Sequence, residues 1–207
     1  MTGRARSVLG AAVRVGMAVR LGACALLLVA AAIPAAATVI VAMDFDEQCA
    51  AADRVFVGTV RAVESRRIAA APQYFETLVT FTVEEAVVGA VPPEVVLRFA
   101  GGEMGGVRQS IDGMPDLRAG ERYVVFADAD HEPPLLSPIV GFNQGLYRAV
   151  SEDGPGGRRS VVRDRVGRPF AASIFGPRAP AGRGPEAMPA EPELVDFLAA
   201  VRAARDR

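Results

Sequence analysis

The sequence contains no lysine and no tryptophan, and its single histidine is His131. One histidine excludes a zinc site built from several histidines, and it leaves at most one Ser–His or Cys–His pair for nucleophilic catalysis. The chain also lacks the G-x-S-x-G turn of serine hydrolases and the Gly-Lys pair of a phosphate-binding P-loop. The commonest catalytic motifs are therefore missing.

Cysteine is almost as rare, with Cys24 near the N-terminus and Cys49 beyond it. If the N-terminal segment is removed, Cys49 has no partner for an intrachain disulfide, and the fold must depend on its apolar core. Cys49 could serve as a reactive thiol or link two structural subunits covalently. We predict instead that it is buried on a helix face, because free cysteine is among the most buried residue types.

Negative charge is absent from the first 37 residues, which carry four arginines. Arg20 is followed by the apolar run Leu21–Ile33 and by Ala35-Ala36-Ala37, the order of a secretory signal peptide with a small-residue cleavage site. A transmembrane helix is the alternative, but the run is too short to span a bilayer comfortably. We therefore predict a signal peptide over residues 1–37, with Met17 as an alternative start, and a secreted or periplasmic protein without membrane insertion.

The rest of the chain is mildly acidic. The net charge of the whole chain is -1, and loss of the four N-terminal arginines leaves about -5. Such a charge gives no electrostatic reason to expect nucleic acid or an anionic membrane as the partner.

Alternation of apolar with other residues predicts a mainly β domain over residues 38–175. Gly58 inside the first alternating run predicts a bulge, and the polar residues 64–73 are expected to form a loop. Gly154 to Gly157 has the composition of a hairpin tip. Period-two alternation marks strands over Arg54–Val63, Phe75–Val83, Val95–Ala100, Arg122–Ala127, Ile139–Val150 and Ser160–Arg163.

The stretch from Val95 to Phe126 is expected to form the centre of the sheet. Its two strands are expected to pair across a connection containing Gly101–Gly106, where glycines take positive φ. A phosphate loop is the alternative for this segment, but no helix start follows it. Gly120 is expected at positive φ before the second strand, and Glu121 is expected either to cap that turn or to bind a partner. The predicted core contains Val57, Phe81, Leu97, Phe99, Val125 and Phe126.

Two helices are predicted at the ends of this domain. Asp44 and Glu47 have the spacing of a capping box for a short helix that carries Cys49. After a Pro/Gly/Ala-rich linker over residues 176–191, residues 192–207 are predicted to form an amphipathic helix. Its apolar residues fall at helical spacing: Leu194, Phe197, Leu198 and Val201.

One loop concentrates polar side chains that could bind a cation. Asp128, Asp130, His131 and Glu132 precede two prolines, and oxygen ligands at alternate positions suit a hard cation such as calcium. Their spacing matches no complete ligand loop, so we predict neither a metal nor a cofactor. Glu84 and Glu85 would face opposite sides of a strand, which is unsuited to paired acid–base work.

Several strand and turn motifs occur together: Ala52–Val60, Phe81–Gly89, Gly101-Gly102, Gly113-Met114-Pro115, Gly120–Phe126 and Gly141–Gly145. As a set, they resemble a widespread group of uncharacterised exported bacterial proteins. The core of that group is similar to the netrin-like, OB-type antiparallel barrel of the tissue inhibitors of metalloproteinases. The resemblance covers about Asp44 to Val150, and it implies a barrel fold and an association with matrixin-type proteases.

The resemblance does not extend to the inhibitory residues. The metalloproteinase inhibitors place a disulfide-bonded N-terminal cysteine on the protease zinc, whereas Thr38 would be the mature N-terminus here and Cys49 lies inside the chain. Our first hypothesis is an exported, non-enzymatic OB-like domain that binds an extracytoplasmic protein, with a metalloprotease as one such partner. The alternative is a metal-dependent hydrolase using the loop around His131.

The export signal gives the first testable prediction. The mature N-terminus is expected at Thr38 or within a few residues of it, because the small residues that precede it fit a signal-peptidase site. Intact-mass measurement of the exported protein tests this. A retained N-terminal segment in the membrane fraction would contradict it.

Overall fold

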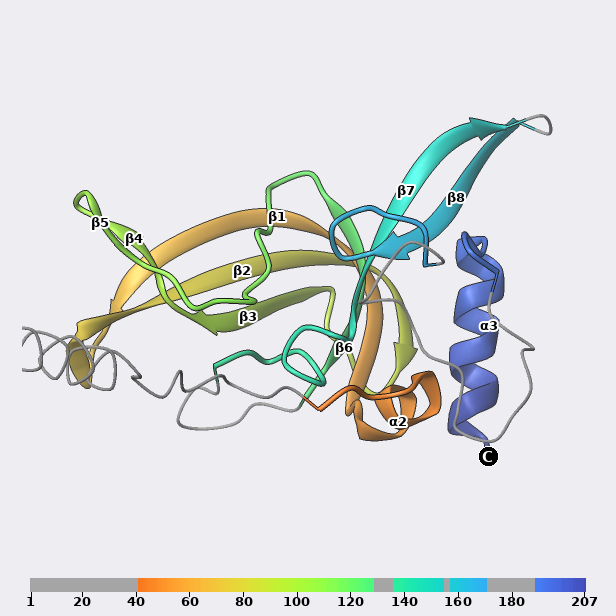
Figure 1. The fold of residues 1–207 in the computed structure, drawn as a ribbon, viewed down its shortest axis with the longest axis horizontal. Coiled ribbons are helices and arrows are strands. Elements are labelled where there is room, and N and C mark those ends of the chain that lie inside the picture. Colours follow the sequence, from red (N-terminus) through yellow and green to blue (C-terminus); the bar gives the residue numbers. More distant parts are fainter. Residues whose placement is uncertain (1–40, 129–135, 155–156, 171–188) are drawn as a thin grey trace, which may run out of the picture. The chain divides into compact units, whose positions relative to one another are not determined.

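The structure is a computed structural model, and it describes residues 41–128, 136–154, 157–170 and 189–207. These residues form a six-stranded antiparallel sheet, a two-stranded sheet and two helices (Figure 1). None of the helices in the described ranges is both long enough and apolar enough to cross a bilayer. The predicted signal peptide, most of the linker and the loop from Asp130 to Glu132 lie outside the described residues.

The large sheet has the strand order β3-β2-β1-β6-β7-β8. Strands β1 and β2 are the longest and are visibly curved (Figure 1). The strands are β1 (Arg54–Ile68), β2 (Ala71–Val88), β3 (Glu94–Ala100), β6 (Arg122–Ala127), β7 (Leu146–Gly154) and β8 (Gly157–Asp164).

The expected central pair is wrong, because β3 and β6 are not paired in the sheet. Strand β3 lies at one edge of the sheet, and β2 and β1 separate it from β6. Strands β1, β2 and β3 follow one another as neighbours, and the chain then returns to place β6 beside β1. This is the order of a Greek key. Which strands pair depends on which apolar surfaces they bury together. The order of strands along the chain does not predict this.

Strand β1 bends through several irregularities in its pairing with β2. One register shift lies between Val57 and Gly58, which confirms the predicted bulge. A β-carbon at Gly58 would lie 3.0 Å from the carbonyl oxygen of Thr82 and 3.2 Å from the ring of Phe56. Glycine is required here because the neighbouring strand and ring come too close for a side chain.

The predicted loop over residues 64–73 is also wrong. Strand β1 continues to Ile68 and β2 begins at Ala71, so only a tight turn separates them. Polar side chains occupy this outer end because they pair across the strands, and Arg66 lies opposite Glu76 in the ladder. Cross-strand pairs of polar side chains extend the strands here, and a search for alternating apolar residues does not detect such pairs.

The interior consists of two clusters on opposite sides of β1. The helix-side core contains Phe45, Cys49, Ala52, Val55, Val57, Val124, Phe126, Val140, Tyr147, Ala149, Val162, Phe170, Leu194, Phe197, Leu198 and Val201. The loop-side core contains Phe56, Val60, Val79, Phe81, Val95, Leu97, Phe99, Leu117, Tyr123, Val125, Ala127, Ile139 and Leu146. All six side chains predicted for the core are buried, and they divide between the two clusters.

Both predicted helices are present and cover the helix-side core. Helix α2 (Phe45–Ala51) has the predicted capping box between Asp44 and Glu47. Helix α3 (Leu194–Arg205) buries the four predicted apolar residues. Its Arg205 donates to the carbonyl oxygens of Cys49 and Ala50 at 3.1 and 3.0 Å, which caps the end of α2. The C-terminal helix is therefore part of the domain.

The described sheet is not a closed barrel. Segment 136–140 instead lies between β3 and β6. Ala100 of β3 donates to the carbonyl of Leu136, and Ile139 forms a bridge with Ala127 of β6. The strand predicted to start at Ile139 starts only at Leu146, because the positive φ angles of Gly141 and Phe142 turn the chain. The predicted hairpin between β7 and β8 is confirmed by the pairing of Gly154 with Gly157.

Phe197 tests whether α3 is integral to the domain. Its ring lies 5.1 Å from that of Tyr147 and 5.5 Å from that of Phe45, measured between centroids. Phe197→Ala should lower the free energy of unfolding by about 3–5 kcal/mol in a urea melt. Val195→Ala is the control, because Val195 is 66% exposed on the same helix. Equal melts for the two variants would contradict the packing of α3.

Candidate functional site

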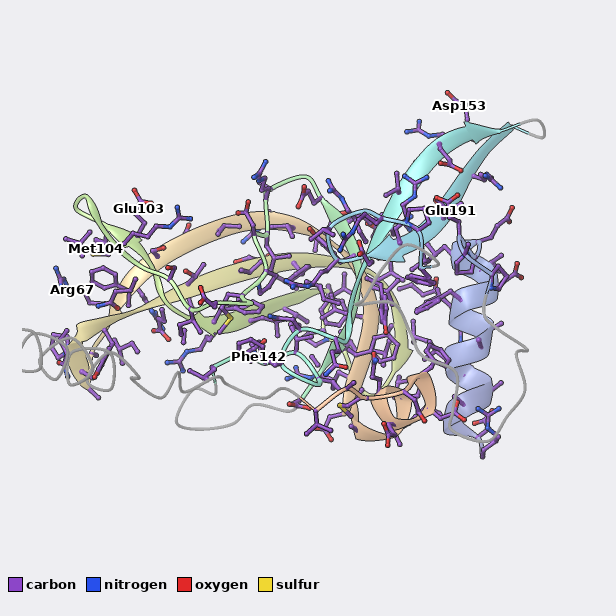
Figure 2. The ribbon with its side chains drawn as sticks, in the orientation of Figure 1. Arg67, Glu103, Met104, Phe142, Asp153 and Glu191 are labelled. Carbon is purple, nitrogen blue, oxygen red and sulfur yellow. The ribbon has the colours of Figure 1, made fainter. Side chains whose placement is uncertain are left out.

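One concave feature of the described surface is a pocket on the loop-side face of β1, β2 and β3. It has a volume of about 270 Å³ and lies between the strands, the hairpin of β4 (Gly102–Met104) and β5 (Val107–Gln109), and segment 110–117. Figure 2 shows Glu103 and Met104 on this hairpin. Segments far apart in the sequence therefore build one cavity.

The floor of the pocket is apolar. Val63 of β1 lies opposite Val79 of β2. Phe99 of β3 lies opposite Thr77, which is two residues from Val79 on the same face of β2. Met114 and Leu117 close the other side. Four of these five apolar side chains belong to the loop-side core or pack against it, while Val63 is 41% exposed. The pocket is thus the place where the core opens to solvent.

Two hydroxyls at one end of the pocket hold the β4–β5 hairpin in place. Thr77 Oγ1 donates to the carbonyl of Gly101 at 2.9 Å. Ser65 Oγ lies 3.4 Å from Thr77 Oγ1 and accepts from the backbone N–H of Glu103 at 3.1 Å. Because the proton of Thr77 is used on Gly101, the proton of Ser65 points to Thr77. Both hydroxyl protons are therefore committed to the scaffold.

The hairpin approaches these hydroxyls closely because Gly102 has no side chain. A β-carbon on Gly102 would lie 2.6 Å from Ser65 Oγ, and the φ of this residue is +148°. Gln109 fastens the other strand, accepting from the N–H of Phe75 at 2.7 Å and donating to the carbonyl of Gln73 at 2.6 Å. The predicted β-connection over Gly101–Gly106 is confirmed, with positive φ at all four glycines.

The opposite wall is held by the turn that follows segment 136–140. Asn143 donates to the carbonyl of Gly113, and Arg165 donates to the same oxygen at 3.2 Å. The backbone of Phe142 takes φ 72°, an uncommon conformation for a bulky residue. A β-carbon on Gly113 would lie 3.1 Å from the ring of Phe142. The wall is thus fixed by side chains that lie 30 and 52 positions further along the chain.

The rim of the pocket carries charges of both signs. Glu103 and Arg108 lie 3.9 Å apart across the hairpin, and both are more than half exposed. Asp116 and Arg118 lie 2.6 Å apart and are also largely exposed. Exposed pairs of this kind contribute little to stability. They leave a mixed polar rim around an apolar floor.

Glu121 does not cap its turn through backbone N–H groups, so that expected role is wrong, and its side chain is only 16% exposed. Its carboxylate accepts from the hydroxyl of Tyr123 and from Arg148, both at 2.6 Å. Burial, followed by the hydrogen bond to the Glu121 carboxylate, raises the pKa of Tyr123 well above its usual value. Gly120 has the predicted positive φ, 86°. The side-chain partners could not be foreseen because β7 supplies one of them.

The candidate cation loop lies only partly within the described part of the chain. Asp130, His131 and Glu132 lie outside the described residues, whereas Asp128 follows β6 and donates its N–H to the carbonyl of Pro138. The described residues contain no group of three acidic, histidine or cysteine side chains that could hold a metal ion. Glu84 pairs with Arg122 and Glu85 with Arg202, so these two carboxylates serve different partners.

Cys49 is fully buried on α2, as predicted. Burial first, and then the nearby Asp46 carboxylate, raises the pKa of its thiol to about 12. A thiol needs its thiolate form to react, so Cys49 is a poor nucleophile in the folded state. It supports neither the reactive-thiol nor the covalent-link interpretation.

Sequence reasoning missed the pocket itself. Its residues come from β1 through segment 110–117, and none belongs to a catalytic motif, although Gly101-Gly102 and Met114-Pro115 fall within the strand and turn motifs. One signal was available: Ser65 and Thr77 interrupt the apolar alternation on the loop-side face of two strands that otherwise carry mainly valine and phenylalanine there. Comparison of the chain with protein-family models, curated proteins and solved structures finds no match.

Ser65→Ala tests whether the hydroxyls of Ser65 and Thr77 hold the β4–β5 hairpin. The change removes the acceptor of the Glu103 N–H and the donor to Thr77, and it should destabilise the fold by about 1–2 kcal/mol. Hydrogen exchange at the Glu103 amide should also become faster. Ser110→Ala is the control, because Ser110 borders the same pocket but makes no side-chain hydrogen bond with the described residues. An unchanged rate of hydrogen exchange at the Glu103 amide would contradict this role of Ser65.

Proposed function

We propose that this chain is an exported, non-enzymatic binding domain and that its pocket receives one large apolar side chain of an extracytoplasmic protein. The observation that carries the proposal is that the polar and the apolar side chains of the pocket have different roles. The hydroxyls of Ser65 and Thr77 hold the scaffold, and the pocket offers a ligand the apolar side chains of Val63, Phe99 and Met114 beside the charged side chains of Glu103 and Arg108. Such a surface suits recognition by burial of apolar area.

The size of the pocket favours a side chain over a free small molecule. Pockets for drug-sized ligands usually have about 300–1,000 Å³, whereas this one has about 270 Å³. A single aromatic or branched aliphatic anchor surrounded by a polar rim is a common arrangement at protein interfaces. Glu103, Arg108, Asp116 and Arg118 supply such a rim here.

The fold proposed for this domain is of the OB type. The Greek-key order and the curvature of β1 and β2 support it, since an OB-fold is a partly open Greek-key barrel that binds through a strand face and neighbouring loops. The pocket lies on such a combination of strands and loops. With the resemblance to the metalloproteinase inhibitors, this makes an exported metalloprotease the first protein partner to test.

The proposal is tested by selecting peptides from a random display library on the mature chain, residues 38–207. Selected peptides should share one large apolar residue. Val63→Arg should weaken their binding by about tenfold or more, because it places a guanidinium group in the pocket wall. Val195→Arg is the matched control, since Val195 is exposed on α3.

Two outcomes would contradict the proposal. One is a selection that yields no binder. The other is equal loss of binding, or none, in the two variants. Circular dichroism of both variants verifies that each keeps its fold, which is expected because both valines are already more than 40% exposed.

A further inference from the structure

The two edges of the six-stranded sheet are treated differently by the rest of the chain. The β8 edge is covered by the segment that leads into α3: Val162 donates to the carbonyl of Pro192, and Val161 forms a bridge with Glu193. The β3 edge has no such cover between Glu94 and Arg98 in the described part of the chain. An uncovered edge is a template for pairing with another strand.

Hydrogen bonds at the ends of β3 give the direction of its backbone groups. Gly101 donates to Phe75 of β2, and Ala100 donates the other way, to Leu136. Because successive residues of a strand point their backbone groups to opposite sides, the even-numbered residues Glu94, Val96 and Arg98 point away from β2. No residue within the described ranges pairs with their backbone on that side.

The free stretch has defined ends. At its beginning, Pro93 lacks an N–H and its carbonyl accepts from Val83 of β2, so the chain has turned inward. At its end, the N–H of Ala100 is taken by Leu136. The outward groups without a partner among the described residues therefore run from Glu94 to Arg98, and Val96 is their midpoint.

We propose that β3 pairs with β3 of a second copy of this chain, antiparallel and with the two-fold axis at Val96. This register is the one that uses all the free outward groups of both copies. It places Val96 opposite Val96 of the second copy, and Glu94 opposite Arg98 of the second copy, twice. Val96 is 47% exposed in the single chain, and pairing would cover it.

The charges on and beside β3 also favour a second copy of this chain as the partner. Arg98 and Arg66 both donate through Nε to the carboxylate of Glu76, at 2.8 and 2.7 Å, so two guanidinium groups share one carboxylate. Glu94 lies 3.0 Å from Arg61. In the paired register, Glu94 of the second copy joins Arg98, and charges of opposite sign alternate across the junction. A strand of another protein would need its own acid at that position, whereas a second copy supplies it.

The proposal goes beyond the proposed function, because the β3 edge is separate from the pocket opening. Pairing over so few residues buries less area than a standard interface. The dimer is therefore expected to be weak and to increase with protein concentration.

Charge exchange provides the first test, by sedimentation velocity of the mature chain at moderate salt. The wild-type mass should rise with concentration toward that of a dimer. Glu94→Arg should remain a monomer, because it places two guanidinium groups opposite each other at both ends of the pairing. Arg98→Glu should also remain a monomer. An equimolar mixture of the two variants should dimerise again, because every opposing pair then has opposite charges.

Cysteine crosslinking provides a second test that does not depend on the stability of Arg98→Glu. Val96→Cys should form a reducible dimer several-fold faster than Val107→Cys, a control at a position that is exposed on β5. Adding Glu94→Arg should abolish the difference. The buried Cys49 does not interfere. A wild-type chain that stays monomeric at all concentrations, or equal crosslinking at the two positions, would overturn the proposal.

Discussion

The register of β1 between its two neighbours is the constraint on which the rest of the structure depends. Over Val55–Thr59 this strand is paired with β2 on one side and with β6 on the other. Within that stretch Val55 and Val57 enter the helix-side core, while Phe56 enters the loop-side core. A slip by one residue would exchange the two cores completely. Both clusters therefore depend on the same short set of backbone hydrogen bonds.

The far half of β1 and β2 separates charged side chains from apolar ones. Beyond Val60 the two strands carry a pocket on the loop-side face and a charged network on the opposite face. Alternation along the strands produces this separation, since Glu76 and Thr77 are neighbours whose side chains point to opposite faces. Burial alone would raise the pKa of Glu76, but hydrogen bonds and charge from Arg66 and Arg98 outweigh it and lower the pKa. The carboxylate therefore stays ionised at neutral pH.

Local patterns in the sequence predicted local structure well. The capping box of α2, the bulge at Gly58 and the buried face of α3 were all readable, because each depends on residues a few positions apart. Partner choice was not readable. The pairing of β6 with β1 and the contact of Glu121 with Arg148 depend on segments far along the chain, so the central pair and the capping role of Glu121 were predicted wrongly. The pocket was missed for the same reason, and the loop around His131 lies outside the described residues.

The Greek-key connection also makes some strand pairings cost more chain entropy than others. Strands β1 and β2 meet through a turn in which Ile68 opposes Ala71, whereas β1 and β6 pair residues such as Thr59 and Arg122, 63 positions apart. Loop-closure entropy grows with the length of the loop, and non-local pairing slows folding. The β1–β2 hairpin is therefore the accessible nucleus, and both cores remain incomplete until β6 docks. During synthesis, this strand pair would leave the ribosome well before the strand that seals it.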